Sequence, residues 1–304
     1  MVFDFFDFSR YRAQLMGIAI IMIMLFHAHF LDCCTIGVEY FIFLSAVGLF
    51  FSLTKNDNLK HYFKKRFVRI LPTYLVVAIP FFFILNRLNW RQFILDLSGL
   101  CVYQHRWFFW FILFIMLCYL VAPFYMRVMK HRFSLVIPFV AIVVCYLLGL
   151  RYPSLEIMLS RVPIFLLGLH VAELVHDRRQ MHGIWVIPVA VAALVLIPVV
   201  KGLHLYAGLT NAIFCFLAIP SMAGIVMLLK KCTPVVLNVL AFLGGITLEI
   251  YMLHECVCMN ALSLVLPYVV AWWLSLPVAV AAGYLLKLLV NGLLSLPSSI
   301  HHNS

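Results

Sequence analysis

The hydrophobic positions of this chain run in long stretches that short polar segments separate. A helix needs about 20 mostly apolar residues to cross a bilayer. Ten stretches approach that length: 13–31, 36–53, 70–86, 107–126, 133–150, 161–176, 183–200, 205–229, 236–257 and 266–288. Residues 90–105 are expected at the interface. The pattern predicts an all-α, polytopic membrane helix bundle with about ten transmembrane helices.

Composition identifies lipid as the solvent. Hydrophobic residues make up 65% of the 304 residues and charged residues 11%, against about 45–50% and 25% in ordinary globular domains. The first stretch exceeds the apolar region of a signal peptide, which is about 7–15 residues long. We therefore expect a retained first helix and one integral membrane domain over residues 1–304, with a short polar tail at 297–304.

Basic residues orient the chain, because Lys and Arg concentrate in cytoplasmic loops. If the N-terminus lies in the cytoplasm, ten spans leave only six of the 22 basic residues outside: Arg87, Arg91, Arg106, Arg151, Arg161 and Lys201. We therefore predict two cytoplasmic termini and a multi-pass protein of the cell inner (plasma) membrane. The net charge of +11 is explained by basic residues that orient the chain and contact anionic lipid head groups. No nucleic-acid partner is therefore expected. The nine cysteines show no metal-ligand spacing, and no metal is expected.

Ionisable side chains inside a span are unfavourable unless they face a partner or water, so they indicate function. At about 1.5 Å per residue, His27 and Glu39 both lie roughly 7 Å outward of the midplane, Glu249 about 3 Å and His254 roughly 10 Å. A neutral imidazole can take a hydroxyl proton, and a carboxylate on its other nitrogen fixes its tautomer. His27 and Glu39 are then either a proton-transfer site or a structural pair. Other ionisable residues of the spans receive no role: His170, Glu173 and Glu255.

A basic cluster opens the third stretch, with the sequence Lys64-Lys65-Arg66-Phe67-Val68-Arg69. Arg66 and Arg69 share a helix face if the helix begins before them. Guanidinium groups suit phosphate oxygens, so the cluster either orients the chain or binds phosphate.

Several segments together resemble acyltransferase family 3, whose membrane enzymes O-acylate bacterial carbohydrates. They follow the family order: Met16–Ala19 with Phe26–Ala28, Gly37–Ala46, Arg66–Pro72, Trp107–Phe111, Phe165–Gly168 and Gly244–His254. One departure is Met16, which stands where the family has an arginine. Arg12 lies one helical turn earlier on a similar face.

The resemblance implies an O-acyltransferase that moves an acyl group, acetyl or succinyl, from cytoplasmic acyl-CoA (acetyl-CoA above all) to a hydroxyl of an extracytoplasmic or lipid-linked carbohydrate of the cell envelope. It implies that His27 and Glu39 are catalytic, either by direct transfer or through an acyl-histidine. Donor-binding roles fall to Arg12, Lys65, Arg66 and Arg69. Substrate or channel roles fall to Ser45, Trp107, Trp110, Glu249 and His254.

Two other interpretations stay open. Intramembrane His and Glu residues are also typical of proton-coupled carriers, so a transporter or flippase of a glycan or small molecule is the alternative. A catalytically impaired family member is a further alternative, because Met16 stands where the family has an arginine. Trp107 and Trp110 could instead belong to an interfacial aromatic belt. The oligomeric state is not predicted.

Overall fold

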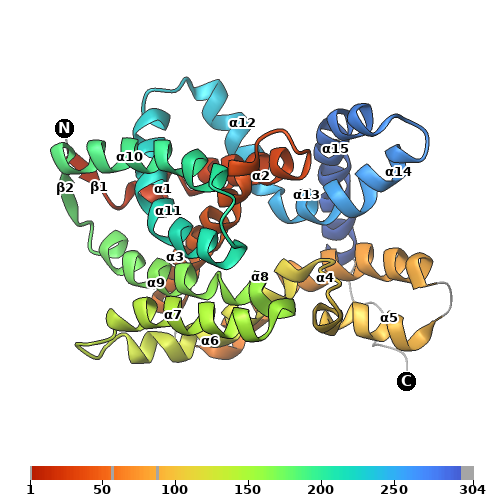
Figure 1. Cartoon of the computed structure of the whole chain (residues 1–304), viewed down its shortest axis with the longest axis horizontal. Helices are drawn as coiled ribbons and strands as arrows, with labels where there is room; N and C mark the ends of the chain where they lie inside the picture. Colours follow the sequence, from red (N-terminus) through yellow and green to blue (C-terminus); the bar gives the residue numbers. More distant parts are fainter. Residues whose placement is uncertain (1, 56–57, 87–88, 296–304) are drawn as a thin grey trace.

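The computed structural model describes residues 2–55, 58–86 and 89–295 (Figure 1). Arg87 and the expected tail at 297–304 lie outside the described residues. The chain is 83% helical, and the strands β1 (Val2–Asp4) and β2 (Gln180–His182) contain three residues each. The predicted all-α class is therefore confirmed.

Long helices form at all ten hydrophobic stretches. They are α2 (Arg12–His27), α3 (Gly37–Lys55), α4 (Leu59–Asn86), α6 (Trp110–Val128), α7 (Val136–Arg151), α9 (Val162–His176), α10 (Gly183–Gly202), α11 (Ala207–Leu229), α12 (Pro234–Gly245) followed by α13 (Thr247–Leu253), and α15 (Tyr268–Ser295). Short helices connect them: α1 (Asp7–Arg10), η1 (Asp32–Ile36), α5 (Trp90–Leu97), η2 (Leu100–Gln104), η3 (Pro153–Leu155), α8 (Glu156–Leu159), the π-helix η4 (His254–Met259) and α14 (Asn260–Ser263).

Seven helices among the described residues are long and apolar enough to cross a membrane. The bent pair formed by α12 and the segment from α13 to α14 makes an eighth if it counts as one span. The apolar helices α2 and α7 have 16 residues each and are shorter than a full span. The chain is thus a polytopic helical membrane protein, and ten spans with both termini inside stay a prediction.

Two helices differ from the sequence pattern. Helix α4 begins at Leu59 rather than near residue 70, so the basic cluster lies on a helix and not in a loop. The predicted ninth span bends by 62° after Gly245. Two consecutive glycines, Gly244 and Gly245, destabilise a helix at this point, because glycine loses more backbone entropy on folding than any other residue.

The crossing of α2 and α12 is the closest helix contact at the centre of the molecule (Figure 1). A Cβ atom on Gly17 would overlap the carbonyl oxygen of Leu240, and one on Gly244 would overlap the carbonyl oxygen of Ala13. Small residues let helix backbones approach this closely in membranes. The contact sets the position of α2, which carries His27, against the chain that carries His254.

The two-stranded sheet lies at one edge of the molecule, at the left in Figure 1. Strand β1 pairs antiparallel with β2, with Val2 opposite His182. An ion pair between Asp7 and Lys230 also ties α1 to the end of α11. These contacts attach the N-terminal segment to the loop between α9 and α10 and to the end of α11.

The close helix crossing predicts a stability effect. Gly17→Ala should lower the free energy of unfolding by about 1–3 kcal/mol, because the added methyl group meets backbone that cannot rotate away. Unfolding of the purified protein in mixed micelles measures the loss. Gly202→Ala is the matched control, since nothing lies within 4 Å of a Cβ there. Equal stability of the two variants would contradict the contact.

Candidate functional site

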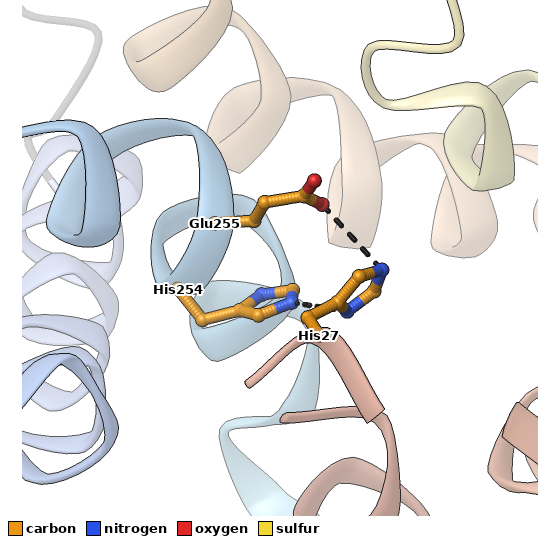
Figure 2. A group of neighbouring side chains, drawn as sticks. All are labelled: His27, His254 and Glu255. Atoms are coloured by element: carbon orange, nitrogen blue, oxygen red, sulfur yellow. Dashed lines mark hydrogen bonds and ion pairs between the residues drawn. The ribbon is translucent and has the colours of Figure 1, made fainter. Parts of the chain in front are cut away.

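Two histidines and one glutamate meet where the end of α2 faces the π-helix η4 (Figure 2). Nε2 of His254 lies 3.0 Å from Nδ1 of His27. Nε2 of His27 lies 3.5 Å from Oε2 of Glu255. His254 is fully buried, whereas about half of the Glu255 side chain is exposed. The three side chains form one cluster in which His27 lies between a second imidazole and a carboxylate.

Two consecutive residues, His254 and Glu255, reach the two different nitrogens of the same imidazole. In an α-helix consecutive side chains point about 100° apart. Residues 254–259 instead form a π-helix, a rare element that often occurs at functional sites. Within this element His254 approaches Nδ1 of His27 and Glu255 approaches Nε2, so the two side chains contact opposite parts of one ring.

Backbone carbonyl groups fix the tautomers. Nδ1 of His254 lies 3.2 Å from the carbonyl oxygen of Ile250 and 3.0 Å from that of Tyr251. A carbonyl only accepts, so Nδ1 of His254 carries the proton and Nε2 of the neutral ring accepts. His27 must then donate from Nδ1. Its Nε2 is left without a proton, facing Glu255, and is the basic atom of the site.

The structure does not bring Glu39 to His27. Glu39 is fully buried, and its Oε1 atom lies 3.6 Å from Nε of Arg161. No hydrogen bond or ion pair joins His27 to Glu39 in the part of the chain described. The expectation rested on equal depth, but depth does not determine the side of the helix on which a residue lies. The carboxylate beside His27 belongs to Glu255.

Arg161 holds a second group of polar residues together. Its guanidinium donates to the carbonyl oxygen of Ile157 at 3.1 Å, to Oγ of Ser160 at 2.9 Å and to Oδ1 of Asn211 at 3.3 Å. It also lies over the ring of Trp110, 5.5 Å from the centroid. Glu39 supplies the charge that this buried cation needs, and so positions Trp110 through Arg161.

The predicted donor-binding residues lie together. Nε of Arg12 donates to the carbonyl oxygen of Leu44 at 2.9 Å, and Nη2 of Arg66 approaches the carbonyl oxygen of Gly48 at 3.4 Å. A Cβ on Gly48 would come within 2.7 Å of the Arg12 guanidinium. Two cations thus meet at one glycine of α3. Arg12 reaches the same surface as Arg66 although Met16 replaces the family's arginine.

Arg69 has a carboxylate partner of its own. Its Nη1 atom donates to Oε1 of Glu249 at 2.8 Å, and Nη2 lies 3.5 Å from Oε2. Glu249 is fully buried on α13, whereas about half of the Arg69 side chain is exposed. Glu249 therefore anchors Arg69 to α13 and lines neither of the cavities described next.

One cavity of about 1030 Å³ connects the basic cluster of Arg12 and Arg66 with His27. The donor-binding set Arg12, Lys65, Arg66 and Arg69 lines it, as do Met16, Ser45, His27, Trp107, Trp110 and Arg161. A second cavity of about 310 Å³ adjoins it at His27 and is lined by His254 and Glu255. The tryptophans line both cavities, so they face the interior of the protein rather than only the lipid interface.

The trio also offers ligand atoms to a metal ion, since one atom from each residue lies within 4.8 Å of the others. Two of these atoms already face each other across the 3.0 Å hydrogen bond between the imidazoles. The carboxylate also lies at the exposed side of the trio. The arrangement as it stands is suited to moving a proton.

Sequence reasoning missed the roles of Glu255 and Arg161. Glu255 follows His254 directly, and helical geometry would turn it away from the same partner. Arg161 was assigned to an outer loop, but it is 5% exposed and precedes α9. An arginine at the start of an apolar stretch, two residues before Pro163, indicates a buried cation only once its acidic partner is known.

Comparison with known proteins gives one match. The acyltransferase family 3 model, described as an acyltransferase domain, matches residues 15–292. No curated protein and no solved structure matches the chain. The match includes His27, His254 and Glu255 and the predicted donor-binding residues except Arg12, which lies just before it.

The buried pair of Glu39 and Arg161 predicts non-additive stability. Glu39→Leu alone should lower the free energy of unfolding by about 3–5 kcal/mol, because it leaves a buried guanidinium unpaired. Adding Arg161→Met should restore part of the loss, since neither charge then remains. Unfolding in mixed micelles gives the four values of the double-mutant cycle. Additive losses would show that Glu39 acts on another partner.

Proposed function

This membrane protein belongs to acyltransferase family 3, and we propose that it moves an acyl group from cytoplasmic acyl-CoA to a hydroxyl of an extracytoplasmic or lipid-linked carbohydrate. The observation that carries the proposal is the single cavity lined both by four basic residues and by His27. The basic residues suit a donor with several phosphate groups, and His27 suits the activation of a hydroxyl.

The proposed orientation places the basic end of the cavity in the cytoplasm. It includes ten spans, with the short helices α2 and α7 among them, and two cytoplasmic termini in the inner membrane. The distribution of Lys and Arg along the loops supports this orientation. The His27 end of the cavity then opens toward the outer face, where a surface glycan or a lipid-linked sugar is accessible.

Donor binding rests on unbalanced positive charge. Arg12 and Arg66 meet at Gly48 without a carboxylate partner among the described residues, and Lys65 also lines the cavity. Like charges this close repel each other, and phosphate groups of CoA would relieve the repulsion. Arg69 has Glu249 as its counter-ion, so the anion is expected to bind chiefly to the other three cations.

The chemistry begins at Nε2 of His27. This atom takes the proton of the acceptor hydroxyl while the oxygen attacks the thioester carbonyl carbon. The carbon–sulfur bond breaks, an ester forms, and the CoA thiolate receives the proton back from the imidazolium. Glu255 stabilises the imidazolium, while His254 holds the ring by accepting from Nδ1.

Loss of the base should remove the activity. His27→Ala is expected to lower kcat about 10²–10⁴-fold, since general-base catalysis contributes that much. The measurement is CoA release and label transfer from radiolabelled acetyl-CoA to a mixture of envelope glycans. His131→Ala, an exposed residue between α6 and α7, is the control. Proton-driven glycan uptake into vesicles without CoA release would instead indicate a carrier.

Loss of a donor-binding cation should act on affinity. Arg66→Gln is expected to raise the KM for acetyl-CoA about 10-fold or more, because charge-assisted hydrogen bonds contribute about 1.5–3 kcal/mol, and to leave kcat nearly unchanged. Lys130→Gln removes an exposed cation outside the cavity and serves as the control. An unchanged KM for Arg66→Gln would place the donor elsewhere.

A further inference from the structure

One cation of the large cavity has no role in the proposed reaction. Lys201 lies in the last turn of α10 and lines the cavity near His27. Its Nζ atom lies over the ring of Phe26, 5.6 Å from the centroid. That ring is in turn 5.1 Å from the ring of His27. The sum of these two distances sets an upper limit of about 11 Å between Nζ of Lys201 and the centre of the His27 ring.

Lys201 forms no ion pair among the described residues, and Glu39, which interacts with it at longer range, is already paired with Arg161. Arg161 has Glu39 at 3.6 Å. Lys201 has no carboxylate within 4.0 Å among the described residues, although it is only partly exposed. Glu156 also lines the cavity, but its carboxylate accepts a hydrogen bond from Asn211 at 3.3 Å and forms no ion pair with Lys201.

The other groups near Lys201 suit a sugar. Trp107 and Trp110 provide aromatic faces, and Thr210 and His204 provide hydrogen-bonding groups in the same cavity. None of these requires a charged ligand. The ammonium group of Lys201, which is only partly exposed, is however most favourable beside water or an anion.

We propose that the acceptor is an acidic carbohydrate, and that Lys201 binds its anionic group. The anion is a uronic carboxylate or a phosphate on the acylated sugar or on its neighbour, since a disaccharide bridges the distance from Lys201 to His27. This inference rests on the proposed function for the identity of the acceptor, but it concerns binding and not the transfer step. Lys201 determines which acceptor binds and takes no part in proton transfer.

The test measures acceptor binding without any donor. Purified protein in nanodiscs of zwitterionic lipid is titrated with a uronic acid-containing tetrasaccharide and with its carboxyl-reduced counterpart. A second pair is a neutral tetrasaccharide with and without a terminal phosphate. Fluorescence of the cavity tryptophans reports binding. Wild type should bind the acidic member of one pair about 10-fold more tightly, as one charge-assisted contact predicts, and the pair that responds identifies the anion.

Substitutions assign the preference to one residue. Lys201→Met should abolish the preference and leave affinity for the neutral sugar unchanged, while Lys201→Arg should retain it. Lys231→Met, which removes an exposed cation at the end of α11, is the matched control. Equal or absent binding of the acidic and neutral sugars by wild type, or a preference that survives in Lys201→Met, would overturn the inference. Charge-selective binding without CoA release would contradict the proposed acyl transfer and leave the inference about Lys201 intact.

Discussion

The contact between the backbones of α2 and α12 is the constraint on which the site depends. Gly17 and Gly244 leave no space for a side chain between the two helices. The chain then bends by 62° and returns through α13 and the π-helix, which brings His254 to the end of α2. Without this contact the two histidines, 227 positions apart in the sequence, would have no fixed separation.

The buried carboxylates divide the cations into two groups. Glu39 and Glu249 each neutralise one arginine, and these pairs join α3 to the start of α9 and α4 to α13. Arg12 and Arg66 keep their charge available to the cavity because no carboxylate of the described chain reaches them. Neutralised arginines thus position neighbouring groups, and unneutralised ones are available to a ligand.

The sequence predicted the helices well and the side-chain partners poorly. Each hydrophobic stretch became a helix, because bilayer thickness and the need to satisfy backbone hydrogen bonds restrict what can form. It also placed His27 and His254 in one layer, and Arg66 with Arg69 on one helix. The sequence analysis paired Glu39 with His27 because the depth of a residue in the membrane can be counted along the helix. Which side of a helix contacts its neighbour depends on packing, and the sequence does not show it. The approach of Glu255 to His27, and the π-helix in which Glu255 lies, have no signal in the hydrophobic pattern.

The cluster at Gly48 has a consequence for the integrity of the membrane. A cavity of about 1030 Å³ is large enough to hold water inside a membrane protein. Fixed positive charges lining a pore repel protons and metal cations electrostatically. In the proposed orientation, Arg12 and Arg66 stand between the cytoplasm and His27. The same cations that attract a phosphate-bearing donor would therefore preserve the transmembrane proton gradient whenever the cavity is empty.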